Sequence, residues 1–181
     1  MKINATLVNP FVEAAMRVLE QVTGVEVRRG QLSYKGKPEP RHGVSIINGV
    51  FGYLTGQVIY NMRTEVAEKL VEKMLPEKPR HRRARLFCET IGELANRITG
   101  DAMCILNQGT DRELRTTTPA VVTGELFNVT LVSKPTLVFS LHTQCGQVEI
   151  NVALGENDDG VFGCEEDLEK GGGVGESMPA A

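Results

Sequence analysis

The sequence has few of the residues that bind metals or form structural disulfides. Its four cysteines show no C-x-x-C spacing, and its three histidines are scattered without the spacing of metal ligands. Zinc binding and redox chemistry are therefore not expected, and free thiols in a reducing compartment are the default. We predict no cofactor of the protein's own.

Long apolar runs and a strong charge imbalance are also lacking. No segment approaches the roughly 20 apolar residues that span a bilayer. Residues 1–4 lead directly into a helix signal, without the basic and then apolar pattern of a secretion signal. The net charge of −3 is too small to indicate nucleic acid or an anionic membrane as a partner. These absences predict a soluble cytoplasmic protein.

What is present is the composition of a globular domain, with 41% hydrophobic and 24% charged residues. A chain of 181 residues fits one domain, or one domain and a tail. The apolar patterns extend over residues 1–154. From Gly155 onward the sequence becomes acidic and then glycine-rich, so we predict that residues 155–181 form a disordered tail.

Apolar spacing and chain breakers predict the order helix, strands, helices, strands. A helix begins at Asn9-Pro10 and stops at Gly24, and the glycine-punctuated stretch 44–62 indicates a hairpin. A second helix starts near Thr64 and is halted by Pro76. The other predicted elements are strands at 25–27 and 31–34, a helix of roughly 39 Å over about 83–108, and strands at 119–124, 127–133, 135–142 and 146–154.

Two short patterns recur in the same order in the two halves of the chain. The helical segment Glu13-Ala-Ala-Met16-Arg17 is similar to Glu93-Leu-Ala-Asn96-Arg97. Further along, the strand segments 56–61 and 146–151 share Gly-Gln-Val followed by asparagine. The repeated order favours a duplicated unit of one helix and several strands.

The long helix has two distinct faces. Its apolar face should pack on the sheet and consists of Phe87, Ile91, Leu94, Ile98, Ala102 and Ile105. Glu89, Glu93, Asn96 and Gly100 fall almost opposite, toward solvent or a partner. A glycine inside a helix costs about 1 kcal/mol relative to alanine, and beside a polar pair it leaves room for a close approach. A solvated helix face without function is the alternative interpretation.

The stretch Glu93-Leu-Ala-Asn96-Arg-Ile-Thr-Gly100 resembles the E-x-x-N-x-x-x-G signature of the CheC/CheX/FliY phosphatases. The Asn9-Pro10-Phe11 helix start, Thr55-Gly56 and the 119–124 strand resemble the CheX branch, and the resemblance covers roughly residues 1–154. It implies an α/β fold of the CheC/CheX type, with a mixed or antiparallel sheet and long helices on one side. It also implies a homodimer that pairs through sheet edges.

The resemblance implies a phosphatase that acts on the aspartyl phosphate of a CheY-like response regulator. It implies that Glu93 forms a salt bridge with a lysine of the regulator and that Asn96 positions the attacking water. Mg²⁺ is then expected in the regulator, not in this protein. Four residues before the glutamate the family usually has Asp or Ser, whereas this chain has Glu89. CheC-type members carry a second signature on the first helix, but here Met16 and Glu20 replace its asparagine and glycine, so one site per chain is expected.

An amide suits this chemistry because phosphoryl transfer depends mainly on positioning and electrostatics. Asparagine offers a donor and an acceptor, so it can orient a water without ionising. Two alternatives keep the fold without the turnover: a non-catalytic adaptor that binds response regulators, and a scaffold associated with the flagellar switch.

The basic stretch 78–85 holds a lysine, four arginines and a histidine. Without interleaved aromatic residues it does not indicate a nucleic-acid site. A solvated linker into the long helix is the first interpretation. The other is that the stretch steers an acidic response regulator toward Glu93 and Asn96.

Overall fold

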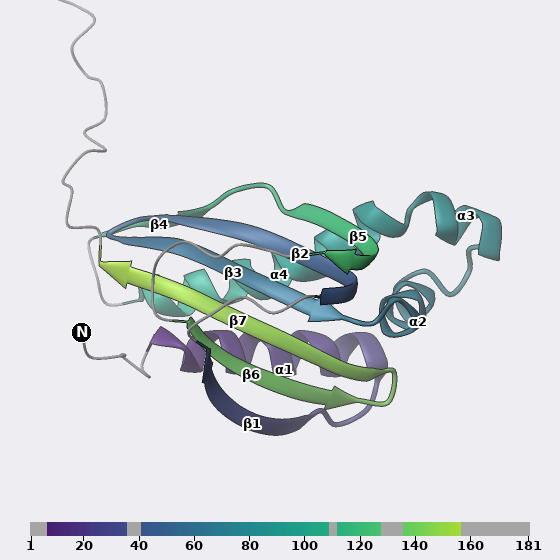
Figure 1. The fold of residues 1–181 in the computed structure, drawn as a ribbon, viewed down its shortest axis with the longest axis horizontal. Coiled ribbons are helices and arrows are strands. Elements are labelled where there is room, and N and C mark those ends of the chain that lie inside the picture. Colours follow the sequence, from purple (N-terminus) through teal and green to yellow (C-terminus); the bar gives the residue numbers. More distant parts are fainter. Residues whose placement is uncertain (1–6, 36–40, 109–111, 128–135, 157–181) are drawn as a thin grey trace, which may run out of the picture.

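The computed structural model describes residues 7–35, 41–108, 112–127 and 136–156. Among these residues, a helix is followed by three strands, and three further helices are then followed by four strands (Figure 1). The elements are α1 (Asn9–Thr23), β1 (Arg28–Lys35), β2 (Arg41–Gly52), β3 (Leu54–Met62), α2 (Thr64–Met74), α3 (Arg80–Arg85), α4 (Phe87–Asn107), β4 (Leu114–Thr116), β5 (Ala120–Phe127), β6 (Thr136–Thr143) and β7 (Gly146–Glu156).

All pairings in the sheet are antiparallel, and they follow the order β1-β6-β7-β3-β2, with β4 and β5 both pairing with the outer edge of β2. β4 pairs with residues 50–52 of β2 and β5 with residues 41–47, so the two short strands share one edge. The α/β fold with an antiparallel sheet confirms the fold class predicted from the sequence.

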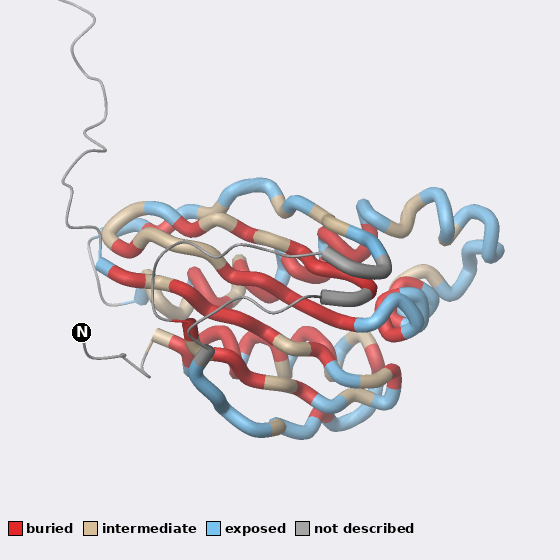
Figure 2. Tube along the Cα trace, in the orientation of Figure 1, coloured by how far each residue is buried: buried red, intermediate tan, exposed pale blue. Residues whose placement is uncertain are grey.

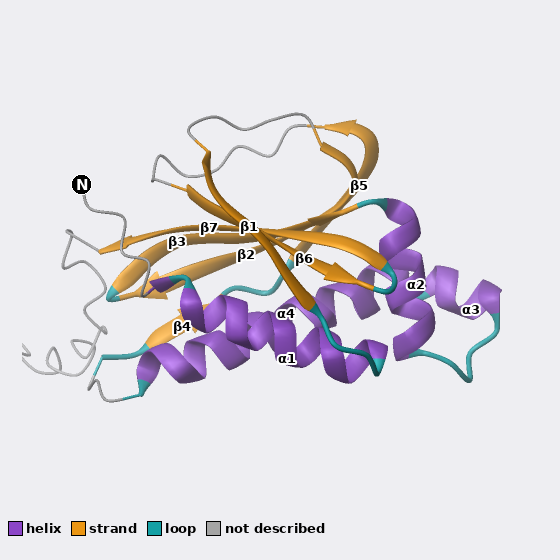
Figure 3. Ribbon diagram, turned by 90° about the horizontal axis from the view of Figure 1, so that it is seen from below, coloured by secondary structure: helices purple, strands orange, loops and turns teal. Residues whose placement is uncertain are grey.

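The helices α1 and α4 lie side by side on one face of the sheet, and α2 and α3 lie at one end (Figure 3). The residues between the two layers form the core, and in Figure 2 the central strands and the inner helix faces are buried. Tyr60, Phe11 and Phe139 are the largest side chains with almost no exposure. No helix among the described residues is long and apolar enough to cross a membrane.

Apart from β4, the strand order is β5-β2-β3-β7-β6-β1, and exchanging the two halves of the chain gives the same order from the other edge of the sheet. Each half supplies a helix and three strands, and the first strand of each half crosses to pair with the second strand of the other: β1 with β6 and β5 with β2. The central pair β3·β7 places Tyr60 opposite Ile150. These two residues are also equivalent in the repeat that aligns 56–61 with 146–151, so an approximate two-fold axis passes through this pair.

The contacts between α1 and α4 obey the same two-fold relation. Arg17 of α1 forms an ion pair with Asp101 of α4 at 2.9 Å, and Arg97 of α4 donates a hydrogen bond to Gln21 of α1 at 3.1 Å. The repeat aligns Arg17 with Arg97 and Gln21 with Asp101, so the two contacts join equivalent positions. Two related contacts in one antiparallel helix pair support the predicted duplication.

The face of the sheet away from the helices carries the two repeated asparagines. The side-chain amides of Asn61 and Asn151 donate to the same Oε1 of Glu149, at 3.4 and 3.0 Å. Ser45 Oγ, which is fully buried, donates to Asn61 Oδ1. The two repeated asparagines, together with Glu149 and Ser45, therefore form one polar cluster around the central strands.

Several predicted boundaries differ from the structure. The predicted strand 31–34 lies within β1, but the strand at 25–27 and the pairing of the two are wrong: Arg28–Lys35 is one strand that pairs with β6, from the other half of the chain. The long helix is interrupted at Leu86, and the three-residue strand β4 was not predicted. β7 continues to Glu156, two residues into the predicted tail, while 157–181 and most of the predicted strand 127–133 lie outside the described residues.

Candidate functional site

The helix α4 presents the predicted polar stripe because its opposite face is fixed against the sheet. Ile91, Leu94, Ile98 and Ala102 are each at most 2% exposed. Three- and four-residue spacing then turns Glu89, Glu93 and Asn96 outward, and all three side chains are exposed. The structure therefore brings the predicted residues onto one open helix face.

Glu93 and Asn96 are separated by one helical turn, a rise of about 4.5 Å along the axis. Among the residues that the structure describes, neither side chain has a hydrogen-bond or ion-pair partner. Glu89 lies one turn further back and brings a second carboxylate. Carboxylates four residues apart repel each other, so this face favours a cation from outside.

The two glycines of α4 face different surroundings. A Cβ on Gly100 would meet no atom within 4 Å, so the helix surface beside Asn96 is open. A Cβ on Gly92 would lie 3.5 Å from Val121 and 3.6 Å from Pro119, which is ordinary packing against β5 and the residue before it. The absent side chain at Gly100 thus leaves room for a partner, whereas Gly92 is covered by the protein itself.

A buried hydrogen bond that sequence reasoning missed fixes α4 to the central strand β3. Thr99 Oγ1 donates to the Ala95 carbonyl at 2.9 Å, so the Tyr60 hydroxyl, 2.7 Å away, donates to Thr99 Oγ1. Complete burial raises the pKa of the Tyr60 hydroxyl well above its ordinary value, and the bond to Thr99 opposes that shift in part. The donor therefore stays protonated. A threonine in the interior of a long helix is the sequence signal that could have pointed to this contact.

The cation nearest to Asn96 in sequence is already engaged. Arg97 donates to Gln21 of α1, and Arg17 on the same helix pair binds Asp101. These contacts hold α1 against the flank of the stripe. The equivalent stripe on α1 has Glu13 but a partly buried Met16 in place of the amide, so it cannot orient a water in the same way.

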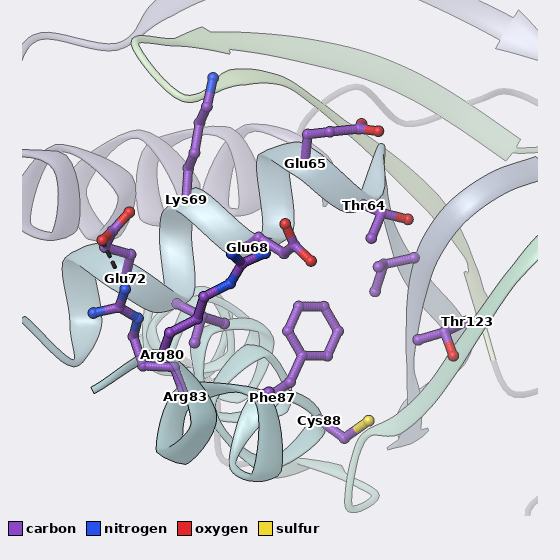
Figure 4. A pocket seen from close by; sticks show the side chains of 13 residues that line it. Thr64, Glu65, Glu68, Lys69, Glu72, Arg80, Arg83, Phe87, Cys88 and Thr123 are labelled. Carbon is purple, nitrogen blue, oxygen red and sulfur yellow. Dashed lines mark hydrogen bonds and ion pairs between the residues drawn. The ribbon is translucent and has the colours of Figure 1, made fainter. Parts of the chain in front are cut away.

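A cleft of about 650 Å³ lies near the stripe, between α2, α3 and the start of α4 (Figure 4). Phe87 from α4 points into it, and Arg83 on its rim binds Glu72 of α2 at 2.8 Å. Its other lining residues are Val44, Thr64, Glu65, Glu68, Lys69, Val71, Arg80, Ala84, Cys88 and Thr123. None of the predicted site residues lines this cleft, and no group of three metal-ligating side chains occurs among the described residues.

Comparison with known families gives a match over more than half of the chain. The model of the family described as chemotaxis phosphatase CheX matches residues 44–142, a range that includes all of α4. A curated relative from Thermotoga maritima, the CheY-P phosphatase CheX, is 28% identical over 142 residues. The match covers 76% of this chain and 90% of the relative.

Solved structures share the fold. A chemotaxis protein CheX from Desulfovibrio desulfuricans has a TM-score of 0.73 at 22% identity, covering 84% of this chain and 99% of that one. A CheX-CheY-BeF3-Mg²⁺ complex from Borrelia burgdorferi has a TM-score of 0.72 at 25% identity, covering 86% and 100%. Both similarities cover more than four fifths of this chain.

Proposed function

This chain belongs to the CheX family of chemotaxis phosphatases, and from that membership we propose that it hydrolyses the aspartyl phosphate of a CheY-like response regulator. The observation that supports this most directly is the open stripe on α4, where Glu93 and Asn96 stand one turn apart without partners among the described residues. The relative from Thermotoga maritima, a CheY-P phosphatase, supports the same reaction.

Asn96 is the catalytic residue of the proposal, and its role is to orient water. Its amide oxygen would accept a hydrogen bond from the water and its amide nitrogen would donate one, which fixes the water in line with the acyl phosphate bond. Attack forms a bond from the water oxygen to phosphorus and breaks the bond to the aspartate oxygen. The products are the free carboxylate and inorganic phosphate, which takes the proton of the water. Asparagine does not titrate near neutral pH, so we expect weak pH dependence from this protein's own groups.

Glu93 docks the partner in this proposal by pairing with a lysine of the regulator. The exposed carboxylate is strengthened as an acceptor when docking excludes water around the pair. Glu89 and Gly100 would contact the partner at the two ends of the stripe, Glu89 by charge and Gly100 by leaving space. Mg²⁺ would be bound by the regulator, and the similar complex from Borrelia burgdorferi, which contains CheY, BeF3 and Mg²⁺, supports this.

The test is phosphate release from a Mg²⁺-loaded, phosphorylated CheY-like regulator with the wild type and three variants. We expect Asn96→Ala to lower turnover by about 100-fold, the loss typical of a misplaced reactant, while binding is largely kept. Glu93→Ala should weaken both. Glu13→Ala on α1, at the position equivalent to Glu93, is the matched control and should behave as the wild type.

An Asn96→Ala variant that turns over at the wild-type rate would refute the role of Asn96. A wild type that binds the regulator but does not accelerate phosphate release would favour the adaptor. Glu89, where the family usually has a shorter side chain, is the feature that favours this second candidate.

We further propose that the protein is a cytoplasmic homodimer. The edge strand β1, whose outer side pairs with no strand among the described residues, exposes Leu32 by 42% and Tyr34 by 58%, and apolar side chains at a sheet edge support pairing with another strand. Light scattering on the purified protein tests this: a dimer that Leu32→Lys and Tyr34→Lys dissociate would support the edge interface.

A further inference from the structure

Glu93 and Arg97 carry opposite charges and lie one helical turn apart on α4. Side chains four residues apart on a helix are neighbours, and a glutamate that precedes a basic residue by four is in the favourable orientation for an ion pair. Both side chains are exposed, so the core does not keep them apart. The sequence of α4 by itself therefore favours a pair that would occupy the carboxylate proposed to bind the regulator.

The structure shows a different partner for Arg97. Its Nη2 donates a hydrogen bond to Oε1 of Gln21 on α1 at 3.1 Å, from one helix to the other. Within the part of the chain that the structure describes, Gln21 is the only hydrogen-bond or ion-pair partner of Arg97, and Glu93 has none. The contact between the helices thus takes up the guanidinium and leaves the Glu93 carboxylate unpaired.

The related positions on α1 show the same preference. Glu13 precedes Arg17 by four residues, and the repeat makes these two the equivalents of Glu93 and Arg97. Arg17 nevertheless binds Asp101 of α4 at 2.9 Å, and Glu13 has no partner among the described residues. In both halves, an acceptor on the neighbouring helix binds the arginine in place of the glutamate on its own helix. The preference therefore belongs to the helix pair and not to one side chain.

The packing of α1 against α4 explains why the acceptor on the other helix is favoured. The two helices lie side by side (Figure 3), and Val18, Leu19 and Ile98 on their inner faces are each at most 1% exposed. The core thereby fixes the backbone of Gln21 opposite that of Arg97. An exposed ion pair within one helix is weak, because water screens it and two long side chains must be ordered. A hydrogen bond from a charged donor is sufficient to displace such a pair.

We propose that Gln21 is a positioning residue for the site on α4: it holds Arg97 toward α1 and so keeps the Glu93 carboxylate available to the lysine of the regulator. This inference rests on the proposed function. Without the acceptor at position 21, Arg97 pairs with Glu93, and the regulator must break that pair before its lysine binds. An exposed pair of this spacing then weakens binding by about 2-fold, which corresponds to about 0.4 kcal/mol.

A double-mutant cycle tests this role. Gln21→Leu removes the acceptor and keeps the size of the side chain, whereas Arg97→Met removes the competing cation. The double variant lacks both, and Gln21→Glu restores an acceptor as the rescue. Arg17→Met is the matched control, because it removes the other contact between α1 and α4 and leaves Gln21 and Arg97 in place. Circular dichroism confirms the folding of each variant.

Two measurements report on the cycle. Titration calorimetry gives the dissociation constant for the BeF3-activated, Mg²⁺-loaded regulator, and phosphate release gives kcat and KM. The NMR signal of the Arg97 Nε–H is followed in the protein without a regulator. It should respond to Glu93→Gln in the Gln21→Leu background, where the two side chains pair, and not in the wild type.

We expect Gln21→Leu to raise the dissociation constant and KM by about 2-fold and to leave kcat unchanged. In the Arg97→Met background, Gln21→Leu should have no further effect, since no competing cation remains. Gln21→Glu and Arg17→Met should bind as the wild type does.

Equal weakening by Arg17→Met would show that a loosened helix pair is responsible and would overturn the positioning role. The same effect of Gln21→Leu in the Arg97→Met background would overturn it as well. So would wild-type binding of Gln21→Leu while Asn96→Ala abolishes turnover, and in that case the proposed function would stand. A wild type that neither binds nor dephosphorylates the regulator would remove the proposed function and this inference together, even if the NMR signal showed that Arg97 changes partners.

Discussion

Gly100→Ala separates the demands of the fold from those of docking. A methyl group at this position would meet no protein atom within 4 Å, so the substitution introduces no clash. Alanine in a helix interior is about 1 kcal/mol more stable than glycine. We therefore expect the free energy of unfolding to rise by about that amount, and the melting temperature by about 2–4 °C.

Docking should respond in the opposite direction. If a regulator packs against the bare backbone at Gly100, one added methyl at that contact costs about 1–3 kcal/mol. A loss of that size weakens the dissociation constant between about 5-fold and about 150-fold. Binding of the BeF3-activated regulator, measured by titration calorimetry beside a thermal melt, reports both quantities on one sample.

Gly92→Ala is the matched control within the same helix. Its methyl would make ordinary contacts with Val121 and Pro119 at 3.5 and 3.6 Å, so it should bring the same gain in stability. It faces the protein and not a partner, so the dissociation constant should not change. The reasoning is refuted if Gly100→Ala binds the regulator as tightly as Gly92→Ala does.

Two further predictions concern the hydrogen bond to α4 and the second helix. Burial raises the pKa of the Tyr60 hydroxyl, so the folded state keeps this proton above about pH 10, where the phenol of an unfolded chain ionises. The free energy of unfolding should therefore fall as the pH rises above about 10, by at most about 1.4 kcal/mol per pH unit. Tyr60→Phe should cost about 0.5–1.5 kcal/mol below pH 10 and remove this part of the slope in denaturant titrations; an unchanged slope would contradict the assignment. Met16→Asn/Glu20→Gly should restore measurable phosphate release to Asn96→Ala, because it rebuilds the signature on α1; no recovery in a folded variant would show that α1 cannot dock the regulator.

The outward position of the polar stripe could be predicted from the sequence because a helix links spacing directly to position. Once the apolar residues of α4 face the sheet, the outward direction of Glu93 and Asn96 follows from periodicity alone. The duplication was predictable for a similar reason, since its two short patterns keep their order. The sequence alone did not distinguish a functional site from a solvated helix face. The open space at Gly100 favours a functional site, and it is visible only in the three-dimensional structure.

The features that the sequence did not predict depend on distant parts of the chain. β1 was predicted as two strands because local patterns contain no information on β6, its partner more than 100 residues away. The interruption at Leu86 was missed because it involves no glycine or proline, although its backbone, with φ −94° and ψ 5°, lies outside the helical range. The basic stretch 78–85 was interpreted as a linker or a steering element, whereas Arg80–Arg85 forms the short helix α3.

The two-fold relation also shows how the two halves differ around the axis. The repeat makes Ile150 the equivalent of Tyr60 and Leu19 the equivalent of Thr99, and all four are fully or almost fully buried. Where α4 is fixed to the sheet by a hydrogen bond, the related positions are two apolar side chains, Leu19 of α1 and Ile150 of β7. Apolar packing is non-directional, whereas a hydrogen bond fixes both rotation and register. The directional contact belongs to the helix that carries Asn96, three residues before Thr99, and the water-positioning role proposed for Asn96 requires an orientation fixed to within fractions of an ångström.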